Sequence, residues 1–551
     1  MKHSVRIRSF LPALLAALVL FLLALVSLPL YNDVDNYLVA IVVNGLFGRD
    51  NGCQYTHVIL NRLMSFLSVL LPGSDVFTLV SRAGIPLAFA SLLALVSRKA
   101  GNRLFTGALY TFFLFLTVGI SVFTGNYGVQ AILFAGTGLM LLLFSDKDRV
   151  SPMYVSGCVF LALGIMWRLQ VALLYIPFIA LECLCMAREK PLSVQRGKTA
   201  AVLVLALFLL GFQAIREHQE PLRSSLEYDR LRTSQVDYSR KDWPEVEEEA
   251  AALGITHAEY EMLSGWLLLD TDHMTARKMA AITSISPKPA FPLTPAGIRE
   301  ACWVLLTYFV GESNCNYVWL AGILLVTVFL LLTAPSAERC LQALFIFAGG
   351  QIIIFYYLMR GRAPMRLIHS VYLAQSFALL CEGVQLRGRI CVSRRVMVPF
   401  FCLLMVVFTG GAFMALRKAE FHAPQLAVNA RVGVDDTALR PPEEGDILIW
   451  DDWGPNFKRP IMRQGKLPTR EMLIQHLPSG EWTYGQFYFN QFLDEIGFAN
   501  PYEALFEKEH VYYAIDGDAS LRLYAEYTPG FHAEQVGSVS GIPIYRFTRS
   551  K

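Results

Sequence analysis

Two aspartates near the N-terminus are the first candidates for chemistry. Asn32, Asp33, Val34 and Asp35 directly follow an apolar run at 10–30, which is long enough to cross a bilayer as a helix. We therefore predict that the carboxylates lie at the membrane surface, where a lipid-borne substrate presents its headgroup. Acidic residues also flank spans simply because water begins there, but ionisable groups near a membrane are often functional.

Arginines at the ends of other apolar runs are the second candidates. Arg168 lies between two runs, and Arg360, Arg362 and Arg366 occupy the link between two more, with His369 one helical turn further on. Three guanidinium groups within seven residues repel one another unless an anion lies between them, and guanidinium forks match phosphate oxygens. We predict a phosphate site at these arginines and His369. The alternative is that the arginines reach lipid phosphates at the membrane surface.

The composition is typical of a membrane protein. Of the 551 residues, 54% are hydrophobic and only 17% are charged, whereas soluble domains carry about 25% charged residues. The net charge of +3 is small and there is no basic tract, so no nucleic-acid partner is predicted. The ten cysteines form no CxxC pair, which argues against a zinc site. Pairing of Cys302 with Cys315 is left open.

Eleven apolar runs are long enough to span a membrane as helices. They lie at 10–30, 76–97, 104–123, 127–144, 152–168, 169–186, 199–215, 316–334, 341–359, 366–383 and 396–416. The stretch 152–186 also admits other divisions. With the N-terminus inside, Lys and Arg concentrate in the short inside loops, and the C-terminus falls outside.

These elements predict a mainly α, polytopic membrane protein with two parts. Residues 1–416 form the transmembrane domain, and residues 417–551 form a small extracytoplasmic α/β domain. Two long loops also fall outside, which we name the first loop segment (31–75) and the second loop segment (216–300). Both contain stretches with helical patterns that are expected to lie at the membrane surface or in water.

Local patterns predict the elements of these outer parts. Thr256 followed by Glu259 is typical of a capping box that opens a helix running through Trp266. Further helices are predicted at 37–47, 58–71, 245–253, 296–310 and 486–496, and strands at 446–450, 510–515 and 542–547. The helices at 37–47 and 58–71 are too short to cross a membrane, so they are predicted to be interfacial or re-entrant.

Carboxylates and arginines at the outer membrane surface suit one reaction class. A sugar on a polyprenyl phosphate is attacked by an acceptor hydroxyl, a carboxylate removes the hydroxyl proton, and arginines stabilise the departing phosphate. Asp33 is the first choice for the base, with Asp35 as its partner. Asp-x-Asp also binds divalent cations, but such cations need more oxygen ligands than this pair supplies. No cofactor or metal is therefore predicted.

Further residues are predicted to line an acceptor or substrate loop. Asn32 precedes the aspartates, and Arg49 and Asp50 follow a glycine-flanked stretch of the same loop segment. Ordinary solvation of a loop explains Arg49 and Asp50 equally well. His57 begins the second predicted helix of this segment, where it is either a structural histidine or a second base.

The arrangement resembles the GT-C superfamily of integral-membrane glycosyltransferases. More narrowly, it is similar to uncharacterised multi-spanning proteins of Gram-positive bacteria. The residues that carry this resemblance are Asn32–Asp35, Gly45–Gly48, Trp167–Arg168, His257–Met262 with Trp266, and Gly361–Arg362. In that family the first run is expected to read Asn-Asp-Asp. Val34 occupies the middle position here, so the resemblance assigns the essential acidic role to Asp33 or Asp35.

The resemblance implies a transferase of the bacterial cell membrane with its site on the outer face. It implies a polyprenyl-phosphate sugar as donor and an envelope glycan, lipid or protein as acceptor. Two other classes are alternatives. A transporter or flippase of lipid-linked saccharides would need alternating access and usually internal repeats, and no convincing repeat is present. A non-catalytic envelope scaffold would leave the outer arginines unexplained.

Overall fold

The structure is a computed structural model. It describes residues 34–48, 53–99, 127–145, 151–178, 196–288, 290–310, 316–334, 336–362, 364–385, 395–396, 398–400, 402–403, 406, 445–451, 467–480, 482–515, 517–539 and 542–550. The predicted spans at 10–30 and 104–123, and most of that at 396–416, lie outside the described residues, as does Cys315.

Long apolar helices dominate the chain up to residue 385. They are α4 (Val76–Lys99), α6 (Tyr127–Leu143), α7 (Pro152–Trp167), α8 (Leu169–Ala172) with the 3-10 turn η1 (Leu173–Tyr175), α10 (Arg196–Glu217), α16 (Asn316–Thr333), α17 (Ala337–Met359) and α18 (Met365–Gln385). Among the described residues, the four helices α4, α10, α17 and α18 are long and apolar enough to cross a membrane. A membrane protein is therefore supported, whereas the total of eleven spans and their orientation stay predictions.

Within the described residues of the stretch 152–186, the chain breaks sharply at the boundary between the predicted spans 152–168 and 169–186. Helix α7 begins at Pro152 behind an N-cap in which the Ser151 hydroxyl accepts from the Tyr154 amide at 3.2 Å. It ends at Trp167, and the chain turns by 114° before continuing as α8. The extended residue at this turn is Arg168, with φ −163° and ψ 100°.

In its described residues the first loop segment contains the helices α2 (Val34–Val43) and α3 (Val58–Leu70). Residues 38–43 of α2 are all fully buried, so this helix packs inside the protein. Asn44 joins the end of α2 to the start of α4, because its amide donates to Asp75 Oδ1 at 3.1 Å and its Oδ1 accepts from the Val76 amide at 3.1 Å. Helix α3 instead exposes an apolar face, as an interfacial helix would.

Five helices form the second loop segment and its exit. They are α11 (Leu222–Val236), α12 (Trp243–Ala252), α13 (His257–Ser264), α14 (Ala276–Ile285) and α15 (Pro295–Val310). The capping box of Thr256 and Glu259 is confirmed at the start of α13. The predicted extension of this helix through Trp266 is wrong: α13 ends at Ser264, and Trp266 has a positive φ of 62°.

The C-terminal part (445–550) is an α/β unit, as predicted. Its strands are β1 (Ile447–Trp450), β2 (His476–Pro478), β3 (Val511–Ala514), β4 (Phe531–Val539) and β5 (Ile542–Arg549). Its helices are α21 (Arg470–Gln475), α22 (Phe487–Glu495), α23 (Pro501–Glu507) and α24 (Ala519–Tyr527). The sheet order is β2-β1-β3-β5-β4, with β1 parallel to β2 and β3, and β5 antiparallel to β3 and β4.

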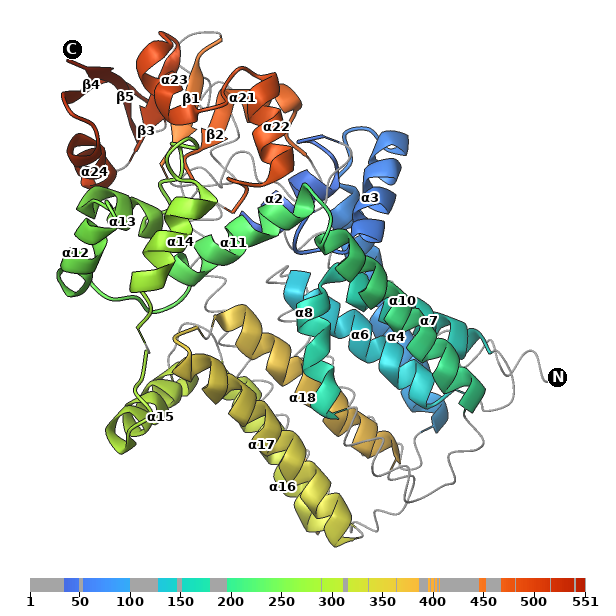
Figure 1. Ribbon diagram of the computed structural model, residues 1–551. Coiled ribbons are helices and arrows are strands. Elements are labelled where there is room, and N and C mark those ends of the chain that lie inside the picture. Colours follow the sequence, from blue (N-terminus) through green and yellow to red (C-terminus); the bar gives the residue numbers. More distant parts are fainter. Residues whose placement is uncertain are drawn as a thin grey trace.

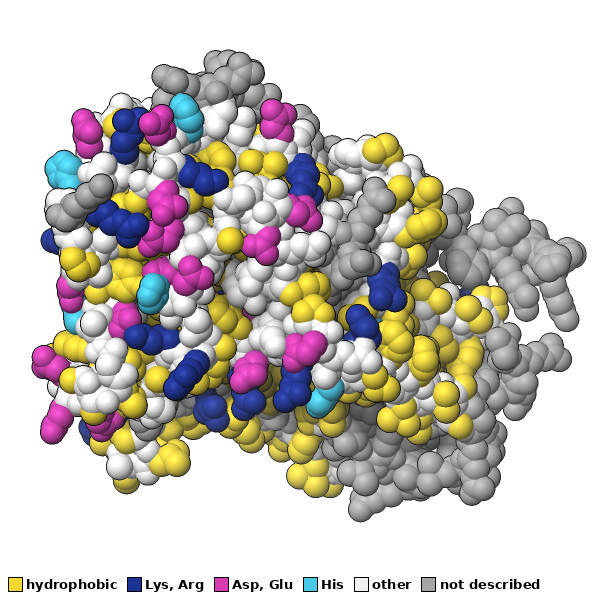
Figure 2. All heavy atoms as spheres, turned by 45° about the horizontal axis from the view of Figure 1, so that its top comes forward, with side chains coloured by type: hydrophobic (Ala, Val, Ile, Leu, Met, Phe, Trp, Pro, Cys, Tyr) yellow, Lys and Arg dark blue, Asp and Glu magenta, His cyan; other side chains and the backbone are white. Residues whose placement is uncertain are grey.

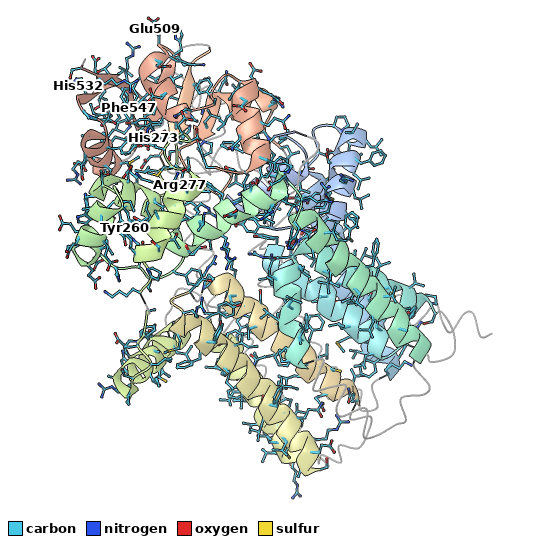
Figure 3. The ribbon with its side chains drawn as sticks, viewed as in Figure 1. Tyr260, His273, Arg277, Glu509, His532 and Phe547 are labelled. Atoms are coloured by element: carbon cyan, nitrogen blue, oxygen red, sulfur yellow. The ribbon has the colours of Figure 1, made fainter. Side chains whose placement is uncertain are left out.

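Figure 1 shows the long helices on one side of the molecule and the C-terminal part with α12, α13 and α14 on the other. Helix α11 lies between these two sides. Tyr260 and His273 of the second loop segment, and Phe547 of the C-terminal part, all lie in the half away from the long helices (Figure 3). Charged side chains are spread over that half, whereas hydrophobic ones gather where α3, α7 and α10 lie (Figure 2).

Candidate functional site

Arg168 lies at the break between α7 and α8, beside the first loop segment. Its guanidinium carbon is 4.5 Å from the centre of the Tyr127 ring and 5.5 Å from that of Tyr55. The preceding Trp167 is fully buried and stacks on Phe77 with ring centres 4.7 Å apart, which fixes the backbone here. The Nε atom of Arg168 is buried without a hydrogen-bond partner among the described residues. This charged donor is therefore available to an acceptor atom of a ligand.

His57 holds the first loop segment against this break. Its backbone amide donates to Met166 O at 2.8 Å, and its Nδ1 accepts from the Ile59 amide at 3.1 Å, which caps α3. Its Nε2 then donates to Leu209 O of α10 at 2.9 Å. Burial lowers the pKa of His57, which favours the neutral ring that this arrangement needs. Both ring nitrogens are used in structural contacts, and the predicted place of His57 in an acceptor loop stays a prediction.

Helix α11 brings a buried ion pair to the same place. Arg232 Nη2 pairs with Asp229 Oδ1, and the Tyr55 hydroxyl donates to the same oxygen at 3.5 Å. The Arg232 guanidinium carbon lies 4.6 Å from the ring centre of Trp266. Burial alone lowers the pKa of Arg232, but Tyr55 and Asp229 raise it by more, so this side chain carries its charge inside the protein.

Arg232 is only 1% exposed, and its Nε and Nη1 atoms have no hydrogen-bond partner within the described part of the chain. Each unpaired buried donor costs about 1–3 kcal/mol. A buried cation with two open donors is an arrangement that water or a ligand completes.

The C-terminal part closes the other side of this site. The Trp482 and Tyr55 rings meet edge to face with their centres 4.8 Å apart. The Tyr488 hydroxyl donates to Gln54 Oε1 at 3.5 Å. These contacts bring three distant segments of the chain together around one tyrosine. We call the group the Tyr55 cluster, and its members are Gln54, Tyr55, Arg168, Asp229, Arg232 and Trp482.

The second predicted arginine group contacts the far end of α11. Arg362 forms an ion pair with Asp237 at 2.5 Å, with side chains 24% and 26% exposed. The guanidinium carbons of Arg360 and Arg362 lie 5.9 and 5.4 Å from the ring centre of Tyr238. The Asp237 carboxylate therefore supplies part of the negative charge that the clustered arginines were predicted to require.

Arg366 and His369 lie on the first turns of α18. The His369 side chain is mostly buried and stacks on Trp319 of α16 with ring centres 6.5 Å apart. Their spacing puts both on one side of α18, as predicted, but a phosphate at these two residues stays a prediction.

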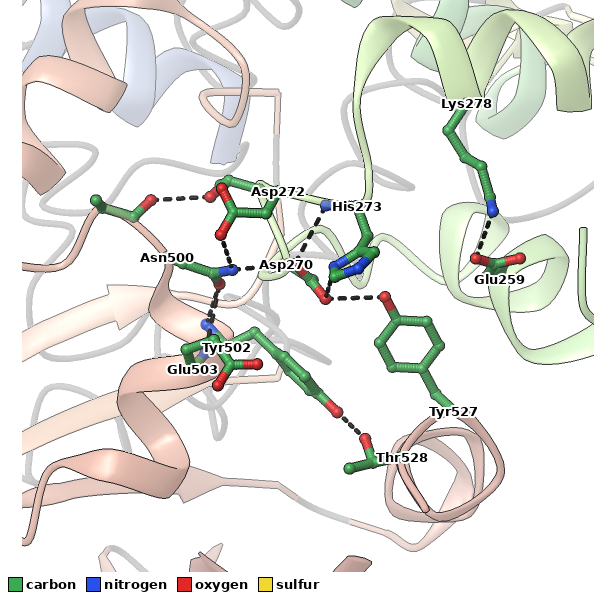
Figure 4. Close-up of polar contacts among 12 residues, drawn as sticks. Glu259, Asp270, Asp272, His273, Lys278, Asn500, Tyr502, Glu503, Tyr527 and Thr528 are labelled. Atoms are coloured by element: carbon green, nitrogen blue, oxygen red, sulfur yellow. Dashed lines mark hydrogen bonds and ion pairs between the residues drawn. The ribbon is translucent and has the colours of Figure 1, made fainter. Parts of the chain in front are cut away.

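A separate polar network joins the second loop segment to the C-terminal part (Figure 4). The Asp270 carboxylate, only 2% exposed, accepts from the Tyr527 hydroxyl at 2.8 Å and from Asn500 Nδ2 at 3.0 Å. It also accepts from the His273 amide at 3.3 Å and contacts His273 Nδ1 at 2.9 Å. Asn500 Nδ2 reaches Asp272 as well, at 2.9 Å. Because every partner belongs to one of the two segments, this network fixes how they dock.

Several predicted site residues lie outside the described residues, namely Asn32, Asp33, Arg49 and Asp50. The backbone of Asp35 belongs to the first turn of α2, and its side chain is not among those described. In the described part of the chain, no three His, Cys, Asp or Glu side chains gather in a way that would hold a metal ion.

Sequence reasoning missed Asp229, Arg232, Gln54 and Trp482. Arg232 lies on a stripe of buried α11 residues at helical spacing, namely Leu222, Ser225, Tyr228, Arg232 and Gln235. Most of these residues are polar, so a search for apolar periodicity passes over the stripe. A search for helical spacing among all large side chains of a polar helix would have found it.

Comparison of the chain with protein-family models, curated proteins and solved structures finds no match.

Proposed function

We propose that this protein is a membrane glycosyltransferase that uses a polyprenyl-phosphate sugar as donor. The observation that carries the proposal is the open Nε of Arg168, buried beside the first loop segment at the break between two apolar helices. A guanidinium there suits a phosphate whose lipid tail lies along the helices. The same loop segment begins with Asp33 and Asp35, the predicted base and its partner.

The proposed reaction is a single displacement at the anomeric carbon of the sugar. The acceptor hydroxyl loses its proton to Asp33 or Asp35 as its oxygen bonds to the anomeric carbon. The bond from that carbon to the phosphate oxygen breaks, and the polyprenyl phosphate leaves with the electron pair. Arg168 stabilises the negative charge on this phosphate. The products are the glycosylated acceptor and the free lipid phosphate, so no oxidant or nucleotide is consumed.

The proposed setting is the outer face of a bacterial cell membrane, with eleven spans and the C-terminal part outside. The acceptor is an envelope glycan, lipid or protein. The first loop segment, the second loop segment and the C-terminal part contact one another in the Tyr55 cluster. Their contact supports the proposal that all three lie on the same side of the membrane. A tag placed after Lys551 should be accessible from outside intact cells, and protection of that tag would contradict the orientation.

The base is tested with Asp33→Asn and Asp35→Asn, made singly and together in the full chain. We expect the variant at the base to lose transfer of a radiolabelled sugar from the lipid donor while it still inserts into membranes. Unchanged product formation in all three variants would refute the mechanism.

The phosphate assignment is tested with Arg168→Gln, with the exposed Arg62→Gln on α3 as the matched control. Removing one charge-stabilising donor typically reduces turnover by roughly 10²–10³-fold. We expect that loss, together with weaker donor binding, in Arg168→Gln only. Equal donor affinity in the two variants would remove Arg168 from the phosphate site.

A further inference from the structure

The Tyr55 cluster and its neighbours contain more unpaired buried donors than unpaired acceptors. Within the described residues, the donors without a partner are Gln54 Nε2, Arg168 Nε, Arg232 Nε, Arg232 Nη1 and Trp482 Nε1. The neighbouring Gln486 Oε1 is an unpaired acceptor, and Thr483 Oγ1 can act either way. A ligand that completes this site must therefore supply mainly hydrogen-bond acceptors.

The charges in the cluster point to a negatively charged ligand. Arg168 and Arg232 bring two guanidinium groups, and the Asp229 carboxylate pairs with the second of them. Arg168 has no ion-pair partner among the described residues. Because Arg168 is assigned to the donor phosphate, the two open donors of Arg232 need acceptor atoms from a second group, and an oxyanion supplies them in a place from which water is largely excluded.

The aromatic rings point to a saccharide as the carrier of that charge. The Tyr55 and Trp482 rings meet edge to face, and the Arg232 guanidinium lies over the Trp266 ring. Such rings offer flat apolar faces, and the N–H of Trp482 is an additional donor for a hydroxyl oxygen. Trp266 has φ 62° directly after the C-cap of α13, where the Leu267 amide donates to Met262 O at 2.9 Å and ends the helix with the Trp266 ring turned toward Arg232.

We propose that the Tyr55 cluster binds a saccharide carrying an oxyanion, either a carboxylate or a phosphate, and that Arg232 is its main anchor. This inference rests on the proposed function only in naming the saccharide as the acceptor of the transferred sugar. Binding itself requires no turnover, so the two proposals fail separately.

The test is ligand-observed saturation-transfer NMR with the full-length protein in lipid nanodiscs. The probes are glucuronate for the carboxylate, glucose 6-phosphate for the phosphate, and glucose as the neutral control. We expect saturable transfer to one or both anionic sugars and at least tenfold weaker binding of glucose. Inorganic phosphate should compete if the oxyanion alone provides most of the affinity for the phosphorylated sugar. Equal binding of all three sugars, or binding of none, would overturn the proposal.

Variants assign the binding to the cluster. Arg232→Gln is expected to weaken binding of the anionic sugar at least tenfold, whereas the exposed Arg230→Gln on the same helix should leave it unchanged. Trp482→Phe keeps an aromatic ring but removes the N–H together with the pyrrole part of the indole, and a three- to tenfold loss of affinity is expected. This variant also tests the site if Arg232→Gln does not fold. Unchanged affinity in Arg232→Gln and Trp482→Phe would show that buried water alone completes these donors.

Asp33→Asn and Asp35→Asn separate the two proposals. Both variants should bind the anionic sugar normally even when transfer is lost. Loss of sugar binding in these variants, with the cluster intact, would place the saccharide elsewhere and overturn the assignment to Arg232.

Discussion

Replacing Asp270 with asparagine should loosen the docking of the second loop segment on the C-terminal part. In Figure 4 one carboxylate oxygen accepts from Asn500 Nδ2 and the His273 amide, and the other accepts from the Tyr527 hydroxyl and meets the His273 ring. An asparagine keeps one oxygen but turns an NH₂ group toward the other pair. Because the His273 amide can only donate, the amide oxygen must stay on its side, and the Tyr527 hydroxyl can then only accept from the new NH₂ group in a neutral bond.

The expected loss follows from these bonds. A hydrogen bond to a charged group contributes about 1.5–3 kcal/mol, and a neutral one about 0.5–1.5 kcal/mol. The change turns the three charged bonds, from Asn500, the His273 amide and Tyr527, into neutral ones, which together weakens docking by about 3 kcal/mol. Since 1.4 kcal/mol corresponds to a factor of ten, opening of this junction should become about a hundredfold more frequent.

Hydrogen exchange of the full-length protein in nanodiscs measures this opening locally. The reporters are the Met274 amide, which donates to Asp270 O at 2.8 Å, and the Tyr502 amide, which donates to Leu269 O at 3.4 Å. The control is Asp272→Asn, because this exposed carboxylate also contacts Asn500 but should cost under about 0.5 kcal/mol. Exchange of both reporters within twofold of the wild type in Asp270→Asn, or equal effects of the two variants, would refute this account.

Three further predictions follow from single contacts. Burial lowers the pKa of His57, so the neutral ring stabilises the fold above the unfolded pKa of about 6.5, and this contribution is lost as the pH falls. Lowering the pH from 7 to 5 should therefore reduce the thermal unfolding temperature of the wild type more than that of His57→Asn. Gly485 has φ +72°, and Gly485→Ala places a Cβ 2.2 Å from a ring carbon of Tyr228 on α11. This variant should lower the free energy of unfolding by about 1–3 kcal/mol more than Gly254→Ala does, because Gly254 has a similar φ of +67° but no neighbour within 4 Å. In a double-mutant cycle of thermal unfolding, Asp237→Asn and Arg362→Ala should couple by up to about 1 kcal/mol, as partly exposed ion pairs do. Zero coupling would show that this ion pair contributes nothing to stability.

The sequence predicted local elements well because local chemistry determines them. Thr256 and Glu259 predicted a helix start, which the structure confirms. The apolar runs at 446–450 and 510–515 predicted buried strands, and they form adjacent parallel strands of one sheet. The end of α13 was missed because the positive φ of Trp266 has no local signature. Long-range contacts were also out of reach, since nothing near Arg362 in sequence indicates that Asp237 is its partner.

The length of α11 bears on the prediction that four arginines hold one phosphate. Asp229 and Asp237 are eight residues apart, which corresponds to about 12 Å along a helix axis. The first contacts Tyr55 next to Arg168, and the second pairs with Arg362. One phosphate is smaller than this separation, so with α11 in place we expect it to bind at one end.

Of the two ends, the one at Arg168 has a buried donor without a partner, whereas Arg362 already has a carboxylate. The donor phosphate is therefore expected at Arg168, with Arg362 holding α11 in position. On this reasoning Arg362→Ala should affect transfer no more than Asp237→Asn does, because each breaks the same contact. A much larger loss of donor affinity in Arg362→Ala would instead mean that Arg362 contacts the phosphate directly, which requires the end of α11 to move away when the donor binds.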